Sequence, residues 1–273
     1  MSEGPAAQPT IGPYTVVRHI AQGSDSAIYE VVCPETGEPR AMKLVSRRDI
    51  RFHRLQRTFM ALNRLSHPHI IRVHELSTAE DGRPYLILDL VNGVPAQVFA
   101  KSVGKAGTPA RTEAVITIGI QLADALAYLH GYNMVHRDVK SANVLVEPGP
   151  RIRLVDFGSA LMPGATQPAD AEFIGTYTYA PPEQIVGHPV SPESDIYAMG
   201  VLLYRLLSGV RPFQADSTEE LTRMHLEDTA VPLGDRVRDL PPHVAPLVAQ
   251  MMAKRRSDRP RRASEVAAAL RGE

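Results

Sequence analysis

The pattern of apolar and polar positions changes at about Val91. From Tyr14 to that point the apolar residues fall in short alternating or β-branched runs separated by glycine turns, a pattern typical of strands. Within this part, residues 55–65 instead place leucine and phenylalanine three and four positions apart, as a helix does. Strands are predicted at 14–17, 27–32, 40–45, 70–76 and 84–90.

After Asn92 and Gly93 the helical period dominates. Thr112 is a candidate N-cap ahead of an apolar stripe, and further helices are predicted over 194–207, 245–253 and 264–270. The glycine- and proline-containing stretches 101–111 and 161–172 are predicted as loops.

A strand-rich half followed by a helical half predicts an α+β, bilobal fold. The expected domain covers 13–271, with an N-lobe over 13–91 and a C-lobe over 92–271. The cleft between two such lobes is the default ligand site. Residues 1–12, rich in proline, alanine and glycine, are expected to form a flexible leader.

Composition narrows the class of protein. With 273 residues and 44% hydrophobic content the chain can bury a sizeable core, and its 30 basic and 30 acidic residues cancel. No net charge therefore favours nucleic acid or an anionic membrane. The single cysteine, Cys33, fits a reducing cytosol, and the leader lacks the features of a signal peptide. We expect a cytoplasmic protein without membrane insertion; the sequence leaves its oligomeric state open.

Two short motifs carry the chemistry. His-Arg-Asp-Val-Lys-Ser-Ala-Asn runs from His136 to Asn143, and Asp156-Phe157-Gly158 follows an apolar strand thirteen residues later. In this order they resemble the catalytic loop and the metal-binding motif of serine/threonine protein kinases, above all the eukaryotic-like (Hanks-type) kinases of bacteria. The resemblance covers roughly 14–270.

The resemblance implies phosphate transfer from ATP to a protein hydroxyl, as in signal transduction. Asp138 would then be the catalytic base that orients the attacking hydroxyl, and Lys140 would neutralise charge on the transferred group. Asn143 and Asp156 would hold magnesium, with manganese as the alternative ion. Lys43, in Ala-Met-Lys, would contact the α- and β-phosphates.

Other positions acquire roles from the same resemblance. Glu183 and Arg259 would form a structural ion pair, and Asp195 would accept hydrogen bonds from the backbone of the catalytic loop. The remaining ATP-binding positions implied are Ala21, Gly23, Ser26, Ile28, Ala41, Leu88, Asp89, Val91 and Leu145.

The part expected to bind nucleotide departs from the family pattern twice. Where the family has three glycines in its phosphate loop, this chain keeps only Gly23, between Ala21 and Ser26. Side chains at the outer positions restrict φ and hold the backbone further from phosphates, so weaker or slower nucleotide handling is expected. The helix glutamate that pairs with Lys43 is replaced by Thr58, and 51–74 contains no acid. A water, Asp156 or another acid would then hold Lys43.

The activation segment, 156–183, departs a third time. The usual phosphorylated threonine lies three residues before Gly175-Thr176, and here that position is Glu172. We expect Glu172 to imitate the phosphate in part and to pair with Arg137, and also with Arg54. The alternative is a solvated loop acid. Thr166 is a further candidate for autophosphorylation.

Two functions of different kinds remain in view. The first is an active serine/threonine kinase that works without phosphorylation of its activation segment, supported by the complete catalytic loop. The second is a pseudokinase that binds nucleotide or a protein partner, supported by Thr58 and the two missing glycines. A small-molecule phosphotransferase is disfavoured, because Gly175-Thr176 and Pro182-Glu183 resemble a peptide-docking segment.

Overall fold

The computed structural model describes residues 9–23, 25–46, 52–161 and 176–273, which separate into two compact units. The first unit contains Met1–Ser66 and Ile71–Asn92, and the second contains His67–Ile70 and Gly93–Glu273. The segment His67–Ile70 belongs to the second unit because its backbone pairs there. The Leu154 amide donates to the His69 carbonyl at 2.7 Å, and Ile70 forms a parallel bridge with Leu154.

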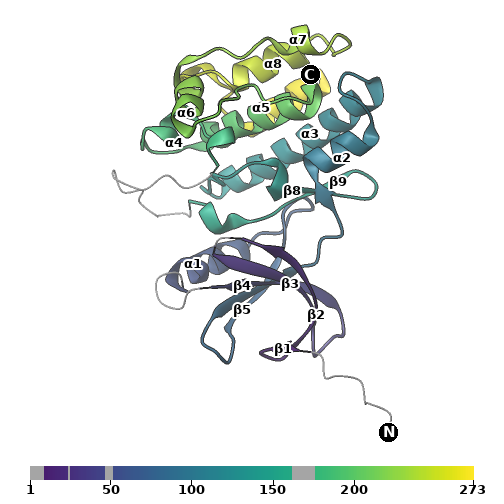
Figure 1. Ribbon diagram of the computed structural model, residues 1–273, viewed down its shortest axis with the longest axis vertical. Helices are drawn as coiled ribbons and strands as arrows, with labels where there is room; N and C mark the ends of the chain where they lie inside the picture. Colours follow the sequence, from purple (N-terminus) through teal and green to yellow (C-terminus); the bar gives the residue numbers. More distant parts are fainter. Residues whose placement is uncertain (1–8, 24, 47–51, 162–175) are drawn as a thin grey trace. The chain divides into compact units, whose positions relative to one another are not determined.

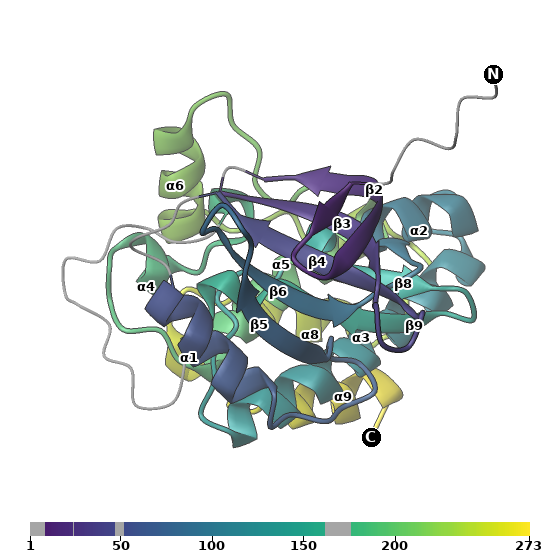
Figure 2. The same cartoon turned by 90° about the horizontal axis from the view of Figure 1, so that it is seen from below.

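An antiparallel sheet forms most of the first unit, in the strand order β1-β2-β3-β4-β6-β5. Figure 2 shows this sheet with α1 (Phe52–Leu62) beside β5. Alternating apolar residues give each strand one face for the core. The strands are β1 (Thr10–Ile11), β2 (Tyr14–Gln22), β3 (Ser26–Val32), β4 (Pro39–Val45), β5 (Val73–Thr78) and β6 (Pro84–Asp89).

The strand prediction needs two corrections. Thr10 and Ile11, assigned to the flexible leader, pair with Thr15 and Tyr14, so the sheet begins inside that leader. The strand predicted from residue 70 begins at Val73 instead. On one face of the sheet lies the core of the first unit, with Tyr14, Val31, Met42, Leu44, Tyr85 and Ile87 buried together.

Helices dominate the second unit (Figure 1). Helix α5 (Pro192–Ser208) lies against α3 (Pro109–Gly131) and α8 (Val244–Met251), and α9 (Ala263–Arg271) packs along α3. Residues 194–204 of α5 are all buried, so this helix is the core of the unit. At its start the Ser191 amide donates to the Ser194 hydroxyl at 3.1 Å and the Ser194 amide donates to the Ser191 carbonyl at 2.9 Å.

The predicted cap of α3 is wrong. The helix begins at Pro109 with Thr108 as N-cap, whereas Thr112 is buried within the first turn and its amide donates to the Thr108 carbonyl at 3.0 Å. Proline at the first helical position has the φ that a helix needs and no N–H to leave unpaired, so it outweighs the capping preference of Thr112.

The loop predicted over 101–111 is also partly wrong. Helix α2 (Ala96–Val103) occupies its beginning and α3 its end. Helices α4 (Pro182–Ile185), α6 (Thr218–Glu227) and α7 (Leu233–Arg236) have no predicted counterpart, and neither do strands β7 (Val94–Pro95) and β8 (Val144–Glu147). These elements are short or polar, and their apolar periodicity is correspondingly weak. The apolar strand expected just before Asp156 is present as β9 (Arg151–Leu154), which pairs with β8. Of the predicted loop 161–172, only Leu161 is described, in a bridge with Val135.

Among the described helices, α3 alone is long and apolar enough to cross a membrane by length and composition. It also packs against α5 and α9, and its side chains Val115, Ile118, Leu122, Leu126 and Leu129 are fully buried in the second unit.

Candidate active site

The segment His136 to Asn143 is fixed by one buried carboxylate. Asp195, near the start of α5, accepts the backbone amide of His136 at 2.8 Å through Oδ2 and that of Arg137 at 2.9 Å through Oδ1. Nε2 of His130, from α3, lies 2.9 Å from Oδ2. The two backbone hydrogen bonds expected of Asp195 are therefore present, and they tie the loop to the core helix.

The pKa of Asp195 reflects these contacts. Burial alone raises it, but the hydrogen bond and charge of His130, with the His136 amide, outweigh burial and hold the pKa below its ordinary value. The carboxylate therefore stays ionised, which a group accepting three hydrogen bonds requires.

Arg137 has an unusual backbone, with φ of 64° in the left-handed region that non-glycine residues rarely adopt. Its amide is bound by Asp195, its carbonyl accepts Nε2 of Gln184 at 3.2 Å, and its guanidinium donates to the Ser159 carbonyl. Contacts on both sides of the residue thus stabilise a conformation that would otherwise be disfavoured.

The carboxylate of Asp138 is the centre of a polar cluster. Oδ2 lies 2.7 Å from Nζ of Lys140 and accepts Nδ2 of Asn143 at 2.9 Å. Oδ1 accepts the Thr176 hydroxyl at 3.3 Å, and that hydroxyl in turn accepts Nζ of Lys140 at 2.9 Å. The structure thus brings together Asp138, Lys140, Asn143 and Thr176, in an arrangement that can hold a hydroxyl donor next to a base and a cation.

Asp156 also has a left-handed backbone, with φ of 60°, and its Oδ1 accepts the Gly158 amide at 3.3 Å. The next residue, Phe157, is buried and its ring meets that of His136 edge-on with centroids 4.8 Å apart. The buried phenylalanine fixes a short helical turn, Phe157–Ser159, and leaves the aspartate at the surface.

The donor set fits a magnesium ion held with a nucleotide. Nδ2 of Asn143 faces Asp138, so Oδ1, the atom of that side chain that binds cations, faces away from it. Magnesium usually takes only one or two carboxylates from a protein, and waters and phosphates complete its octahedron. Among the described residues there is no cluster of three or more His, Cys, Asp or Glu, and such a site does not need one.

In the first unit, five of the implied ATP-binding residues share one face of the sheet. Register pairs Ala21 with Ile28 and Ile28 with Lys43, and Ala41 with Leu88, so their side chains lie on the side opposite the buried core. We name this surface, with Leu86 opposite Lys43, the Lys43 face. All residues of the Lys43 face belong to the first unit.

The two departures from the family pattern lie in the same unit. Gly23 closes the turn between β2 and β3, its amide donating to the Ser26 carbonyl at 2.8 Å. A Cβ added to Gly23 would lie 3.4 Å from that carbonyl oxygen, within ordinary contact distance. Thr58 lies on α1 and is buried.

Glu183 and Arg259 form the expected ion pair. The guanidinium binds both carboxylate oxygens, at 2.8 and 2.9 Å, with both side chains buried. Burial alone raises the pKa of Glu183, but the hydrogen bonds and charge of Arg259, with a hydrogen bond from Ser194, hold it below its ordinary value. The guanidinium also donates to the carbonyls of Glu193, Ala253 and Lys254.

The remaining predicted residues are placed as follows. The Asp89 amide donates to the Arg72 carbonyl at 3.0 Å and its carboxylate lies 2.7 Å from His74, while Val91 follows β6 at the end of the first unit. Leu145 lies in β8 of the second unit. Thr166 and Glu172, and the side chain of Arg54, lie outside the described residues.

Sequence reasoning missed three residues that support the site: His130 beside Asp195, Gln184 beneath Arg137, and Ser194 on Glu183. The contacts of His130 and Gln184 join residues 65 and 47 positions apart, and that of Ser194 joins residues 11 apart in different helices, so none leaves a local signal in the sequence. The order of His130 and His136 was visible, but only the packing of α3 against α5 places His130 on Asp195.

Comparison with known proteins shows the family of the chain. Residues 14–269 match the family model of the protein kinase domain. The serine/threonine-protein kinase PknD of Mycobacterium tuberculosis is 34% identical over 267 residues, covering 94% of this chain and 39% of PknD. PknA of the same species is 32% identical over 255 residues, covering 89% and 57%, and PknK of Mycobacterium bovis is 31% identical over 260 residues, covering 93% and 23%. The chain thus spans less than two thirds of the length of these curated relatives.

Proposed function

The chain belongs to the protein kinase domain family, and from that premise we propose that it transfers the γ-phosphoryl group of ATP to serine or threonine hydroxyls of a protein substrate. One observation carries the proposal: Lys140, Asn143 and Thr176 each have a polar atom within 3.3 Å of the Asp138 carboxylate. The names of the bacterial relatives, serine/threonine-protein kinases, support the class of acceptor.

Each group then has a chemical part. Asp138 orients the attacking hydroxyl and takes its proton as the hydroxyl oxygen bonds to the γ-phosphorus and the bond from that phosphorus to the leaving ADP breaks. Lys140, 2.7 Å from Asp138, stabilises negative charge on the transferred group. When bound, magnesium neutralises the phosphate oxygens, and Asn143 and Asp156 are the side chains that would hold it. From the first unit, Lys43 would contribute its charge to the phosphates, and the Lys43 face would receive the base.

The proposal is tested with Asp138→Asn, which keeps the shape and the contact with Asn143 but removes the base. We expect transfer of labelled phosphate from Mg-ATP to a generic protein substrate to fall by about 10²–10⁴-fold, while ATP binding measured by calorimetry persists. Asp235→Asn, a matched change at an exposed position of α7, leaves transfer unchanged. Nucleotide binding without transfer in the unmodified chain contradicts the proposal.

We also propose that the Glu172 carboxylate takes the place of a phosphorylated residue in the activation segment. Its expected partner, Arg137, belongs to the catalytic loop, which supports this proposal. The proposal rests on the sequence. Chain produced without phosphate on Thr166 or Thr176 should be active, and Glu172→Ala should lower transfer several-fold, because a carboxylate supplies only part of the charge of a phosphate. An unchanged rate in Glu172→Ala identifies the residue as a solvated loop acid.

We propose that the protein is located in the cytoplasm, because it has a single cysteine and its charges balance. The same composition supports a protein substrate in preference to nucleic acid.

A further inference from the structure

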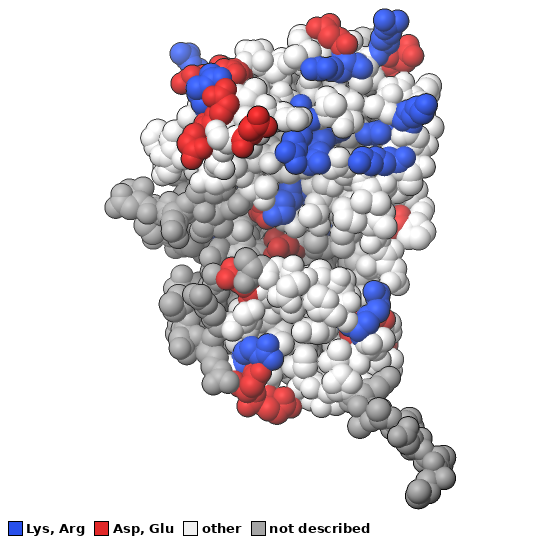
Figure 3. Space-filling model, viewed as in Figure 1, with Lys and Arg blue, Asp and Glu red and all other residues white. Residues whose placement is uncertain are grey.

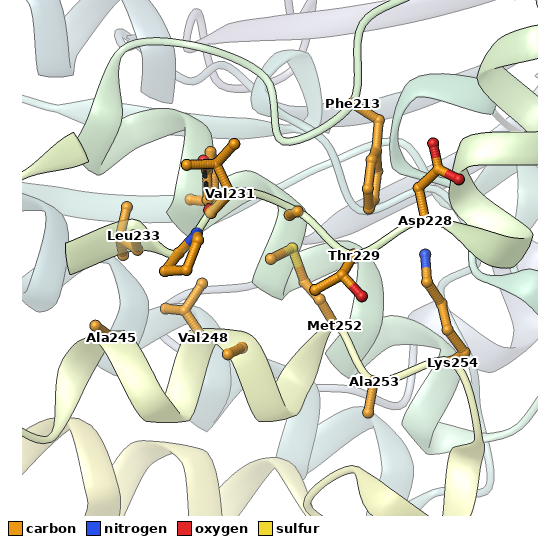
Figure 4. A pocket seen from close by; sticks show the side chains of 14 residues that line it. Phe213, Asp228, Thr229, Val231, Leu233, Ala245, Val248, Met252, Ala253 and Lys254 are labelled. Carbon is orange, nitrogen blue, oxygen red and sulfur yellow. Dashed lines mark hydrogen bonds between the residues drawn. The ribbon is translucent and has the colours of Figure 1, made fainter. Parts of the chain in front are cut away.

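A cavity of about 200 Å³ lies in the second unit among residues that take no part in the proposed chemistry. Figure 4 shows Phe213, Asp228 and Lys254 at one end of it and Leu233, Ala245 and Val248 at the other. Sites for drug-sized ligands typically measure ~300–1,000 Å³, so this cavity suits one large side chain better than a whole metabolite.

The lining is apolar along most of its length. Leu233, Val248 and Met252 are buried beneath it, while Val231 at its edge is 43% exposed. Apolar surface that is partly open to water gains from being covered by an apolar group. The cavity therefore favours an aliphatic or aromatic side chain as its occupant.

Hydrogen bonds fix the walls in place. The Tyr204 hydroxyl, on α5, donates to the Val231 carbonyl at 2.9 Å and so holds the segment between α6 and α7. Nζ of Lys254, after α8, donates to the Met224 and His225 carbonyls at 3.0 and 2.7 Å, and lies 4.4 Å from the centre of the Phe213 ring. A site whose walls are already tied loses little entropy when it binds.

Helix α6 and its flanking residues carry an excess of acids, one of which, Asp228, lines the cavity. We name residues 216–228 the acidic segment; in Figure 3 acidic side chains gather over α6. Against five acids it has one arginine, Arg223, and adding Lys254 still leaves a net charge of −3 (2 − 5). His225 does not offset this, because burial, together with Lys254, lowers its pKa to about 4. The acids are Asp216, Glu219, Glu220, Glu227 and Asp228.

Part of this charge is already neutralised within the segment. Arg223 pairs with Glu220 at 2.7 Å, with Asp228 at 2.8 Å and with Glu227 at 3.5 Å. All these groups are exposed enough to remain weak, solvent-screened pairs, and the excess of acids persists around them. A cationic partner therefore meets a favourable field.

We propose that the cavity and the acidic segment together form a docking site for a basic peptide segment of a protein partner, one large apolar side chain of which enters the cavity. Apolar burial supplies affinity, and charge complementarity supplies orientation and speed of association. The inference goes beyond the proposed function, since binding here requires no phosphate transfer.

The test uses the full chain and a short fluorescein-labelled peptide in which one leucine is flanked by lysines and arginines, with binding followed by anisotropy. We expect saturable binding that weakens as salt rises. Replacing the peptide leucine by alanine should weaken it at least about tenfold, as loss of a central apolar contact does.

Variants of the protein then locate the site. Ala249→Phe should fill the cavity from its exposed edge and weaken binding at least about tenfold, whereas Gln250→Phe, one position along α8 and outside the lining, should not. Glu219→Lys with Glu227→Lys should weaken binding and reduce its salt dependence, whereas Glu113→Lys on α3 should change neither.

Four outcomes overturn the proposal: no binding, binding unaffected by Ala249→Phe, binding indifferent to the peptide leucine, and a self-association of the chain that Ala249→Phe abolishes, which would make a second copy the occupant. Phosphate transfer to a substrate lacking the basic segment is measured alongside. Ala249 lies outside the catalytic cluster. If the Ala249→Phe variant loses peptide binding but keeps phosphate transfer, docking has failed and catalysis has not.

Discussion

The catalytic loop of the second unit and the Lys43 face of the first hold their polar groups in different ways. Asp138 is within 3.3 Å of three polar side chains, and the loop that carries it is bound twice by Asp195. On the Lys43 face the residues opposite Lys43 are Ile28 and Leu86, both apolar, and α1 carries no acid.

The difference teaches where this chain tolerates change. Asp138, Lys140, Asn143 and Thr176 depend on one another for position, so losing one should disturb the others. The residues of the Lys43 face each occupy a separate strand position in a sheet whose core lies on its other side. The sheet is formed with Thr58 and without the two outer glycines, and we expect these departures to act on ATP handling.

The largest expected effect breaks the second unit. Arg259→Ala removes one partner of a buried ion pair and leaves the Glu183 carboxylate without its charge partner, which should lower the free energy of unfolding by ~3–5 kcal/mol. Urea denaturation followed by circular dichroism measures this.

Arg262→Ala is the matched control, because Arg262 pairs with Glu265 in the open, with side chains 76% and 41% exposed. Its loss should cost less than ~1 kcal/mol. Equal costs for the two variants would show that the pair between Glu183 and Arg259 is not what holds this corner together.

A second prediction concerns acid. His225 is buried beside Tyr197 and Phe213, and its pKa is lowered from 6.5 to about 4, so the unfolded chain takes up a proton first as pH falls. The contribution to stability is complete above pH 6.5 and is lost between 6.5 and about 4, by up to roughly 3 kcal/mol.

His225→Phe keeps the ring and removes the titration, so the fall in urea midpoint over that pH range should become shallower. His188→Phe, at an exposed position, should keep the original slope. If the slope is the same in all three proteins, other groups govern the acid sensitivity of the second unit.

The smallest effect is expected from restoring the two missing glycines of the first unit. Ala21→Gly with Ser26→Gly restores the outer glycines and lets the backbone approach the phosphates, so the KM for ATP should fall several-fold with little change in kcat. Steady-state kinetics at varied ATP measures it, and Ala27→Gly, on the opposite face of β3, should give no such gain. An unchanged KM would mean that the missing glycines do not limit ATP binding. The next substitution to test would then be Thr58→Glu.

How far the sequence predicts this molecule depends on whether a contact is local. The run from His136 to Asn143 contains Asp138, Lys140 and Asn143 within eight positions. These candidate catalytic residues can therefore be predicted from the sequence before the fold is known. Asp195 was expected to bind the loop backbone from family resemblance, and its two hydrogen bonds are present.

Non-local packing explains the rest. His130 reaches Asp195 only because α3 lies against α5, and Ile70 joins the second unit because Leu154 offers it a bridge. The cavity has the same origin: Phe213 and Lys254 are forty-one positions apart and meet through the fold. Thr112 shows the converse, a good local capping signal overruled by the neighbouring Pro109.

The left-handed backbone of Arg137 limits how this position can evolve. Glycine is the residue that relieves such a φ at no steric cost, and in most turns it would be the easy replacement. Here glycine would forfeit the guanidinium that donates to Ser159. Replacement by glycine would relieve the backbone but lose the guanidinium contact, and replacement by another side chain would lose that contact without relieving the backbone. Arginine should therefore be retained at position 137, and substitutions should be found at neighbouring positions instead.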